Sequence, residues 1–145
     1  MLTLKLLLLS AFVPLLLLTK FPIVHAMFLP KCDFVTPVER LRTSNAVFSG
    51  KVIEVIETEG IQRTKFRVSK SWKNVGVKEI TIVNVIHHEG PYFERGKSYL
   101  VYAWKQKGHL MTGGCSGTGE VEQAQNEIEQ LDKWHAHNKS KSGKR

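Results

Sequence analysis

Short runs of β-branched and aromatic residues, separated by turn residues, fill the chain between positions 47 and 112. The run Thr64–Trp72 alternates apolar with polar residues, which predicts a strand whose buried face carries Phe66, Val68 and Trp72. Turn residues such as Glu59-Gly60 separate this run from its neighbours. Five strands are therefore expected, over Val47–Glu57, Thr64–Trp72, Glu79–Ile86, Ser98–Trp104 and His109–Thr112.

One helix is expected on either side of these strands. The run from Thr36 to Glu39 combines a capping box with proline at the first helical position, which predicts a short helix ending near Thr43. After the glycine-rich, irregular stretch Gly113–Gly119, a second helix is expected from its apolar stripe of Val121, Ala124, Ile128 and Leu131. Its acids, Glu120, Glu122, Glu127 and Glu129, would form the solvated face. The prediction is a mainly β fold, an OB-fold-like barrel with a short N-terminal helix and a C-terminal amphipathic helix.

The length of 145 residues leaves room for one ordinary domain behind an apolar leader. Lys5 precedes an apolar run, Leu6–Leu18, that is shorter than the roughly 20 residues a membrane-spanning helix needs. Val24 and Ala26 fit the small-residue pattern of a cleavage site, so residues 1–26 are predicted to be a signal peptide and the protein to be secreted. An uncleaved anchor that includes residues 21–24 is the alternative. The domain would then span 27–132, followed by a tail over 133–145.

The basic character of the chain is concentrated in that tail. The sequence has 21 Lys and Arg against 13 Asp and Glu, and no acid occurs after Lys133. Such a tail is expected to be disordered. It would serve either as a solubilising end or as a weak attachment to anionic polymer at the cell surface. Nucleic acid is not expected as a partner, because nucleic-acid-binding domains usually carry their charge on a folded face.

The two cysteines of an exported chain are expected to form one disulfide, between Cys32 and Cys115. The alternative is two free thiols, with one of them acting as a nucleophile beside His109. No serine, histidine and aspartate set or carboxylate pair with supporting context indicates an enzyme.

Two histidine clusters contain the residue types that bind metals, His87-His88-Glu89 and His135-Ala136-His137. Neighbouring histidines on a strand point to opposite faces, and the second cluster lies beyond the apolar stripe, so no metal or other cofactor is expected. The strand aromatics, Trp72, Tyr99, Tyr102 and Trp104, would stack on sugars if they faced a ligand, but core packing is their commoner role.

Four segments carry a family resemblance: Asn45–Val52, Phe66–Lys73, Gly96–Ala103 and Gly114–Ser116. Together they resemble the tissue inhibitor of metalloproteinases family, especially its single-domain bacterial members, over residues 32–132. The resemblance implies a secreted netrin-like module of the OB type, a monomer whose expected partner is a zinc metalloprotease or another extracellular protein.

The chain departs from the family pattern at one disulfide. Members of that family begin their domain with Cys-x-Cys, and Pro30 and Glu89 stand where the cysteines of the first bridge would be. Both partners of that bridge are replaced together, whereas Cys32 and Cys115 match the second bridge. In the family the terminal cysteine chelates the target's zinc through its amine and carbonyl oxygen, but the predicted mature chain starts at Met27. Inhibition would therefore depend on a wedge formed by neighbouring loops and the N-terminal segment, with Met27, Phe28, Leu29, Pro30, Lys31 and Asp33 as its residues.

Overall fold

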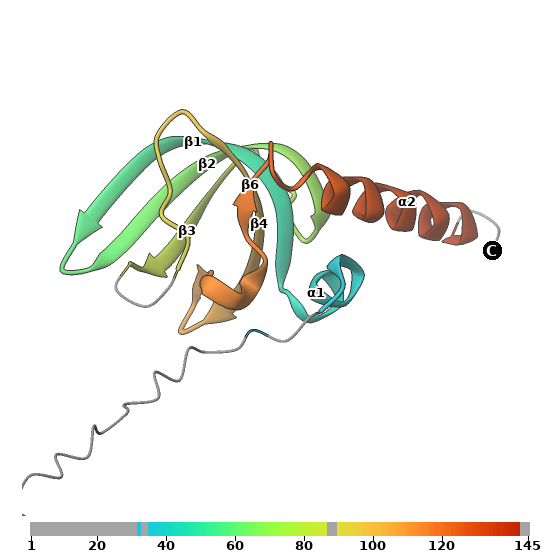
Figure 1. The fold of residues 1–145 in the computed structure, drawn as a ribbon, viewed down its shortest axis with the longest axis horizontal. Coiled ribbons are helices and arrows are strands. Elements are labelled where there is room, and N and C mark those ends of the chain that lie inside the picture. Colours follow the sequence, from blue (N-terminus) through green and yellow to red (C-terminus); the bar gives the residue numbers. More distant parts are fainter. Residues whose placement is uncertain (1–31, 33–34, 87–89, 143–145) are drawn as a thin grey trace, which may run out of the picture. The chain divides into compact units, whose positions relative to one another are not determined.

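The computed structural model describes residues 32, 35–86 and 90–142, which belong to one compact unit that begins at Cys32. Most of the regular structure in this unit is β (Figure 1). In chain order the elements are α1 (Pro37–Thr43), β1 (Ala46–Thr58), β2 (Ile61–Lys73), β3 (Glu79–Val85), β4 (Ser98–Gln106), β5 (His109–Met111), the short 3-10 helix η2 (Gly114–Ser116), β6 (Gly119–Glu120) and α2 (Gln125–Ser142). The predicted mainly β class is confirmed.

The strands form a six-stranded sheet in the order β1-β2-β3-β5-β4-β6, and β1 also pairs with β4. This extra pairing joins the first five strands of that order into a ring. The ring is uneven, because β3 and β5 share a single parallel pair, Val83 with Met111. The predicted count of five strands is wrong: β6 adds a short sixth strand on β4, with Tyr99 opposite Glu120. Gly119 was expected to lie in the irregular stretch, but it forms the two-residue strand β6 together with Glu120.

Two hydrophobic cores lie on opposite faces of β4, because alternate residues of a strand point to opposite sides. Tyr99, Val101 and Ala103 belong to the inner core of the ring, whereas Leu100 and Tyr102 pack under the helices. Phe66 is central to the inner core and makes edge-to-face contacts with three other rings, those of Phe48, Phe93 and Tyr99. The outer core is completed by residues of α1 and α2, which the sheet alone would leave exposed.

The sequence prediction places Trp72 on the wrong face of its strand. It was assigned to the same buried face as Phe66 and Val68, but it packs in the outer core beneath α2. The pairing of β1 with β2 shifts between Ser49 and Gly50, so that one residue of β2 has no partner there. Such a bulge reverses the alternation of the residues that follow it. Trp72 therefore faces the helix, and not the inside of the ring.

The capping signal predicts α1 correctly. Thr36 accepts a hydrogen bond from the backbone N–H of Glu39, and the Glu39 carboxylate accepts one from the backbone N–H of Thr36. Pro37 is the first helical residue. The two hydrogen bonds satisfy backbone donors at the start of the helix, and Pro37 carries no N–H that would need a partner. The local sequence alone is therefore enough to start this helix.

Helix α2 lies further along the chain than predicted. Val121 donates its backbone N–H to the Ser98 carbonyl oxygen, and the turn that follows delays the helix until Gln125. The helix then continues to Ser142, through most of the stretch predicted to be a disordered tail; residues 143–145 lie outside the described part. Trp134 provides the physical reason, because it packs on the outer core and extends the apolar stripe by one turn beyond Leu131. No helix within the described ranges is both long and apolar enough to cross a membrane.

Candidate functional site

The predicted disulfide is present and fixes the start of the unit to the loop after β5. Cys32 and Cys115 are bonded, with their Cα atoms 5.3 Å apart. Neither cysteine is free, so the interpretation as a nucleophilic thiol beside His109 is wrong. Cys115 belongs to η2, a turn that follows two consecutive glycines. The bond holds the chain at Cys32 beside this glycine-rich loop.

An open groove of about 540 Å³ lies next to the disulfide. One wall is formed by Arg40 of α1 and by Val35, two residues before this helix, and another by Tyr102 and Trp104 of β4. The loop Gly113–Ser116 completes the lining. Most of the surface that these groups offer is apolar or backbone, and this composition is typical of a binding site for a peptide or an apolar side chain.

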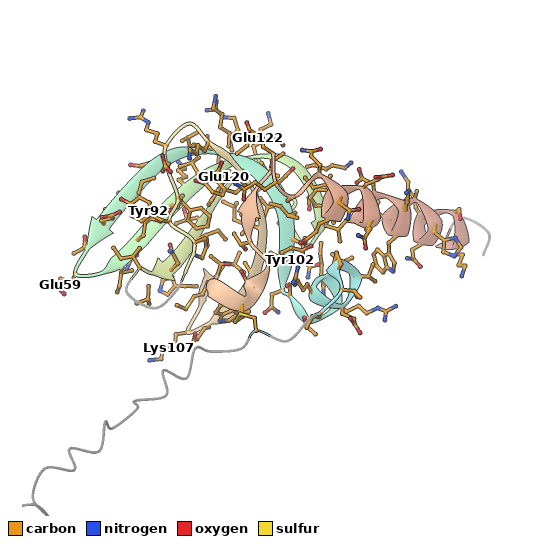
Figure 2. All side chains as sticks on the ribbon, in the orientation of Figure 1. Glu59, Tyr92, Tyr102, Lys107, Glu120 and Glu122 are labelled. Carbon is orange, nitrogen blue, oxygen red and sulfur yellow. A yellow bond between two sulfur atoms is a disulfide. The ribbon has the colours of Figure 1, made fainter. Side chains whose placement is uncertain are left out.

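Arg40 joins α1 to α2 at the back of the groove. Its guanidinium donates to both carboxylate oxygens of Glu127, at 3.2 and 3.1 Å, and lies 6.0 Å from the centre of the Tyr102 ring. The Tyr102 hydroxyl donates to the same carboxylate at 3.1 Å. Burial, reinforced by the negative charge of Glu127, raises the pKa of Tyr102 far above its ordinary value. Tyr102 therefore stays protonated and serves as a fixed donor in this cluster, beside α1 in Figure 2.

Gly117 allows Arg40 to reach this position. Its φ of +82° favours glycine, and a Cβ atom there would lie 2.6 Å from the Arg40 guanidinium. The loop itself is fixed by hydroxyl groups. Thr112 donates to the Tyr102 carbonyl oxygen at 2.9 Å, and Thr118 accepts the Tyr102 backbone N–H at 3.0 Å. The groove is thus bordered by a glycine-rich loop that side chains hold against β4.

Trp104 forms the exposed rim of the groove. Its side chain is 38% exposed, and a Cβ atom on Gly113 would lie 3.1 Å from its ring. The ring therefore rests on the glycine backbone and presents its other side to solvent. An aromatic side chain that is rigidly held and partly exposed is a common anchor for protein partners. The other strand aromatics, Trp72, Tyr99 and Tyr102, are buried, as the packing interpretation predicted.

Several residues of the sequence prediction lie outside the described part of the chain. The wedge residues Met27, Phe28, Leu29, Pro30, Lys31 and Asp33 are among them, and so is the cluster His87-His88-Glu89. His135 and His137 are exposed on the last turns of α2. Within the described ranges no group of three or more histidine, cysteine or acidic residues could hold a metal ion.

Sequence reasoning missed the cluster of Arg40, Tyr102 and Glu127. Glu127 was assigned to the solvated face of its helix, but its side chain is 31% exposed and bound to Arg40. These residues are far apart in the sequence, so spacing carries no signal for their contact. The one available signal was the length of the first predicted helix, which is too short to be stable alone and must pack on another element.

Searches with models of known protein families and among curated proteins gave no match for this chain.

Proposed function

We propose that this chain is a secreted, protein-binding module of the metalloproteinase-inhibitor type, with a netrin-like, OB-type barrel. The Cys32–Cys115 bond carries the proposal, because it fastens the start of the unit to the loop that borders the groove. Cys115 lines the groove, and Trp104 lies on the same groove. A preformed groove loses little conformational freedom when a partner binds.

Zinc chelation by a terminal amine does not belong to this proposal. With cleavage after Ala26, five residues would separate the terminal amine from Cys32. A lead of this length does not hold an amine rigidly enough for chelation. Any inhibition would instead come from steric exclusion of substrate, with the groove and Trp104 bound to the protease beside its active site.

An inhibition assay tests the proposal. The protein from Met27 to Arg145 is mixed at micromolar concentration with a panel of zinc endopeptidases, and hydrolysis of a peptide substrate is followed. Slower hydrolysis by at least one enzyme is expected. Unchanged rates across the panel would refute the inhibitor function.

A variant at the rim connects that activity to the groove. Trp104→Ala should weaken inhibition at least tenfold, as expected for an aromatic anchor. Val77→Ala is the matched control, because Val77 is also an exposed apolar residue, 57% exposed, and does not line the groove. Equal inhibition by both variants would place the binding surface elsewhere.

A second candidate function is attachment at the cell surface through the end of α2, with the barrel binding a protein or a glycan. After Asp132 the exposed part of this helix carries Lys133, Lys139 and Lys141 and no acid. Deletion of residues 138–145 should reduce retention on cells and make the remaining binding less sensitive to salt, because fewer charges take part. Retention that the deletion leaves unchanged would exclude this candidate.

A further inference from the structure

Part of β1 forms an open edge of the sheet. β1 pairs with β4 only over Ala46–Lys51, whereas its pairing with β2 continues to Thr58. The last backbone bonds on the β4 side join Val52 to Gly96 and Lys97 at 2.9 Å. Within the described residues, no strand pairs with the outer side of Glu54–Thr58. Alternate residues of such an edge turn their N–H and C=O groups toward solvent, where another chain can pair with them.

An apolar side chain is exposed on this edge. Ile56 is 51% exposed and pairs across the sheet with Arg63. Ile61, at the start of β2, is 39% exposed, and Tyr92 is 58% exposed in the loop before β4. A strand added beside β1 would cover Ile56 directly. The backbone groups would supply affinity, and Ile56 would select an apolar residue at one position of the added strand.

The charges along the edge indicate the kind of partner. Glu54, Glu57 and Glu59 lie on or next to it, all three exposed. Lys65, which pairs with Glu54, is engaged by Glu79 at 2.9 Å on the far side of β2. Arg63, which pairs with Ile56 and is exposed, is a second cation beside the edge, so three acids face two cations. The net negative charge favours a basic partner over a second copy, because two like-charged copies repel each other.

We propose that the edge Glu54–Thr58 of β1 accepts, as an added strand, an extended segment of a partner protein in which basic residues alternate with apolar ones. The site is independent of the groove: Glu59 marks the tip of the β1–β2 hairpin in Figure 2, far from Tyr102. Failure of the inhibitor function would leave this site untouched. Two separate surfaces of one unit would then be able to hold two different segments.

Peptide titration tests the added strand. The probes are two blocked peptides, Lys-Val-Lys-Val-Lys and Glu-Val-Glu-Val-Glu, added to the protein from Met27 to Arg145 at low salt. Amide hydrogen exchange is measured for every residue. The basic peptide should slow exchange at least tenfold at edge amides between Glu54 and Thr58, and the acidic peptide should leave these amides unchanged.

Charge variants separate the edge from general attraction. The double variant Glu54→Lys with Glu57→Lys should weaken binding of the basic peptide at least tenfold, whereas Glu129→Lys, at an exposed position of α2, should change it less than twofold. Ile56→Ala keeps the charge and should also weaken binding severalfold.

Three outcomes would overturn the proposal. The first is an absence of protection at the edge at millimolar basic peptide, and the second is equal binding of the acidic peptide. The third is a concentration-dependent dimer, seen by sedimentation, that Ile56→Lys abolishes, because this result would assign the edge to a second copy.

Discussion

Gly50 is the residue whose identity the fold restricts most clearly. It lies next to the register shift between β1 and β2, where the two strands approach closely. A Cβ atom at this position would lie 2.8 Å from the Arg67 carbonyl oxygen, which is backbone and cannot rotate away. The bulge that turns Trp72 toward α2 therefore depends on the absence of a side chain at Gly50.

Gly50→Ala should destabilise the protein by about 1–3 kcal/mol, because the added methyl group forces the strands apart. Gly76→Ala is the matched control, since a Cβ atom there meets nothing within 4 Å. The free energy of unfolding, measured with urea, gives the comparison. Equal stability of the two variants would contradict the close approach at Gly50.

At the residue scale, the sequence predicted contacts between residues that are close together in the chain. The capping residues Thr36 and Glu39 lie within one turn of each other, and their contact follows from the motif alone. The faces of Trp72 and Glu127 depend on a bulge and on a helix elsewhere in the chain. No local pattern records either partner, so both assignments failed.

At the scale of elements, the packing of α2 on the sheet depends on one acidic residue. Asp132 accepts a hydrogen bond from the Trp72 indole at 2.7 Å and pairs with Lys70 at 2.6 Å. Partial burial alone would raise the pKa of Asp132, but the hydrogen bonds from Lys70 and Trp72 outweigh it and lower the pKa. These contacts join the helix to β2 through the charged form of the acid.

This arrangement predicts a loss of stability in acid. Because the pKa of Asp132 is lower in the folded chain, its contribution is present above the unfolded pKa, about 3.9, and is lost as the pH falls through the folded pKa. Asp132→Asn should be less stable than the natural protein by a constant amount at neutral pH. That difference should shrink toward zero as the pH falls through the folded pKa of Asp132.

Urea unfolding at several pH values measures this difference. Glu122→Gln, at an exposed position without a hydrogen bond or ion pair to another described residue, is the control and should show no loss at neutral pH. A difference for Asp132→Asn that persists undiminished in acid would show that the carboxylate charge does not hold α2.

Among the elements, the long alternating runs and the capped helix were predictable, and the short ones were not. β6 has two residues and exists only because β4 is beside it. The start of α2 is set by the contact of Val121 with Ser98, and its end by packing of Trp134. Tertiary contacts thus decided the boundaries that periodicity alone placed wrongly.

For the whole molecule, the disulfide connects parts of the chain that are 83 residues apart. Loss of a native disulfide from a small secreted domain typically costs about 2–5 kcal/mol. Replacing both Cys32 and Cys115 with alanine should therefore lower the free energy of unfolding by an amount in that range. A loss below about 0.5 kcal/mol, the size of a typical surface substitution, would show that the bond adds little to stability.

At the scale of the whole molecule, the groove could not be predicted from the sequence. The sequence indicated the bond between its cysteines through their number and expected compartment. It did not indicate that α1, β4 and the Gly113–Ser116 loop would enclose a hollow beside that bond. The groove depends on the packing of α1 beside β4, with Leu41 and Tyr102 in one core, and no local pattern in the sequence records that contact.

The central claim is that the chain is fastened at Cys32 to the edge of this groove. Peptide mapping of the purified protein, alkylated and digested without reductant, tests it most directly. The account predicts one crosslinked peptide pair that contains Cys32 and Cys115, and no alkylated thiol. Two alkylated cysteines would contradict the account.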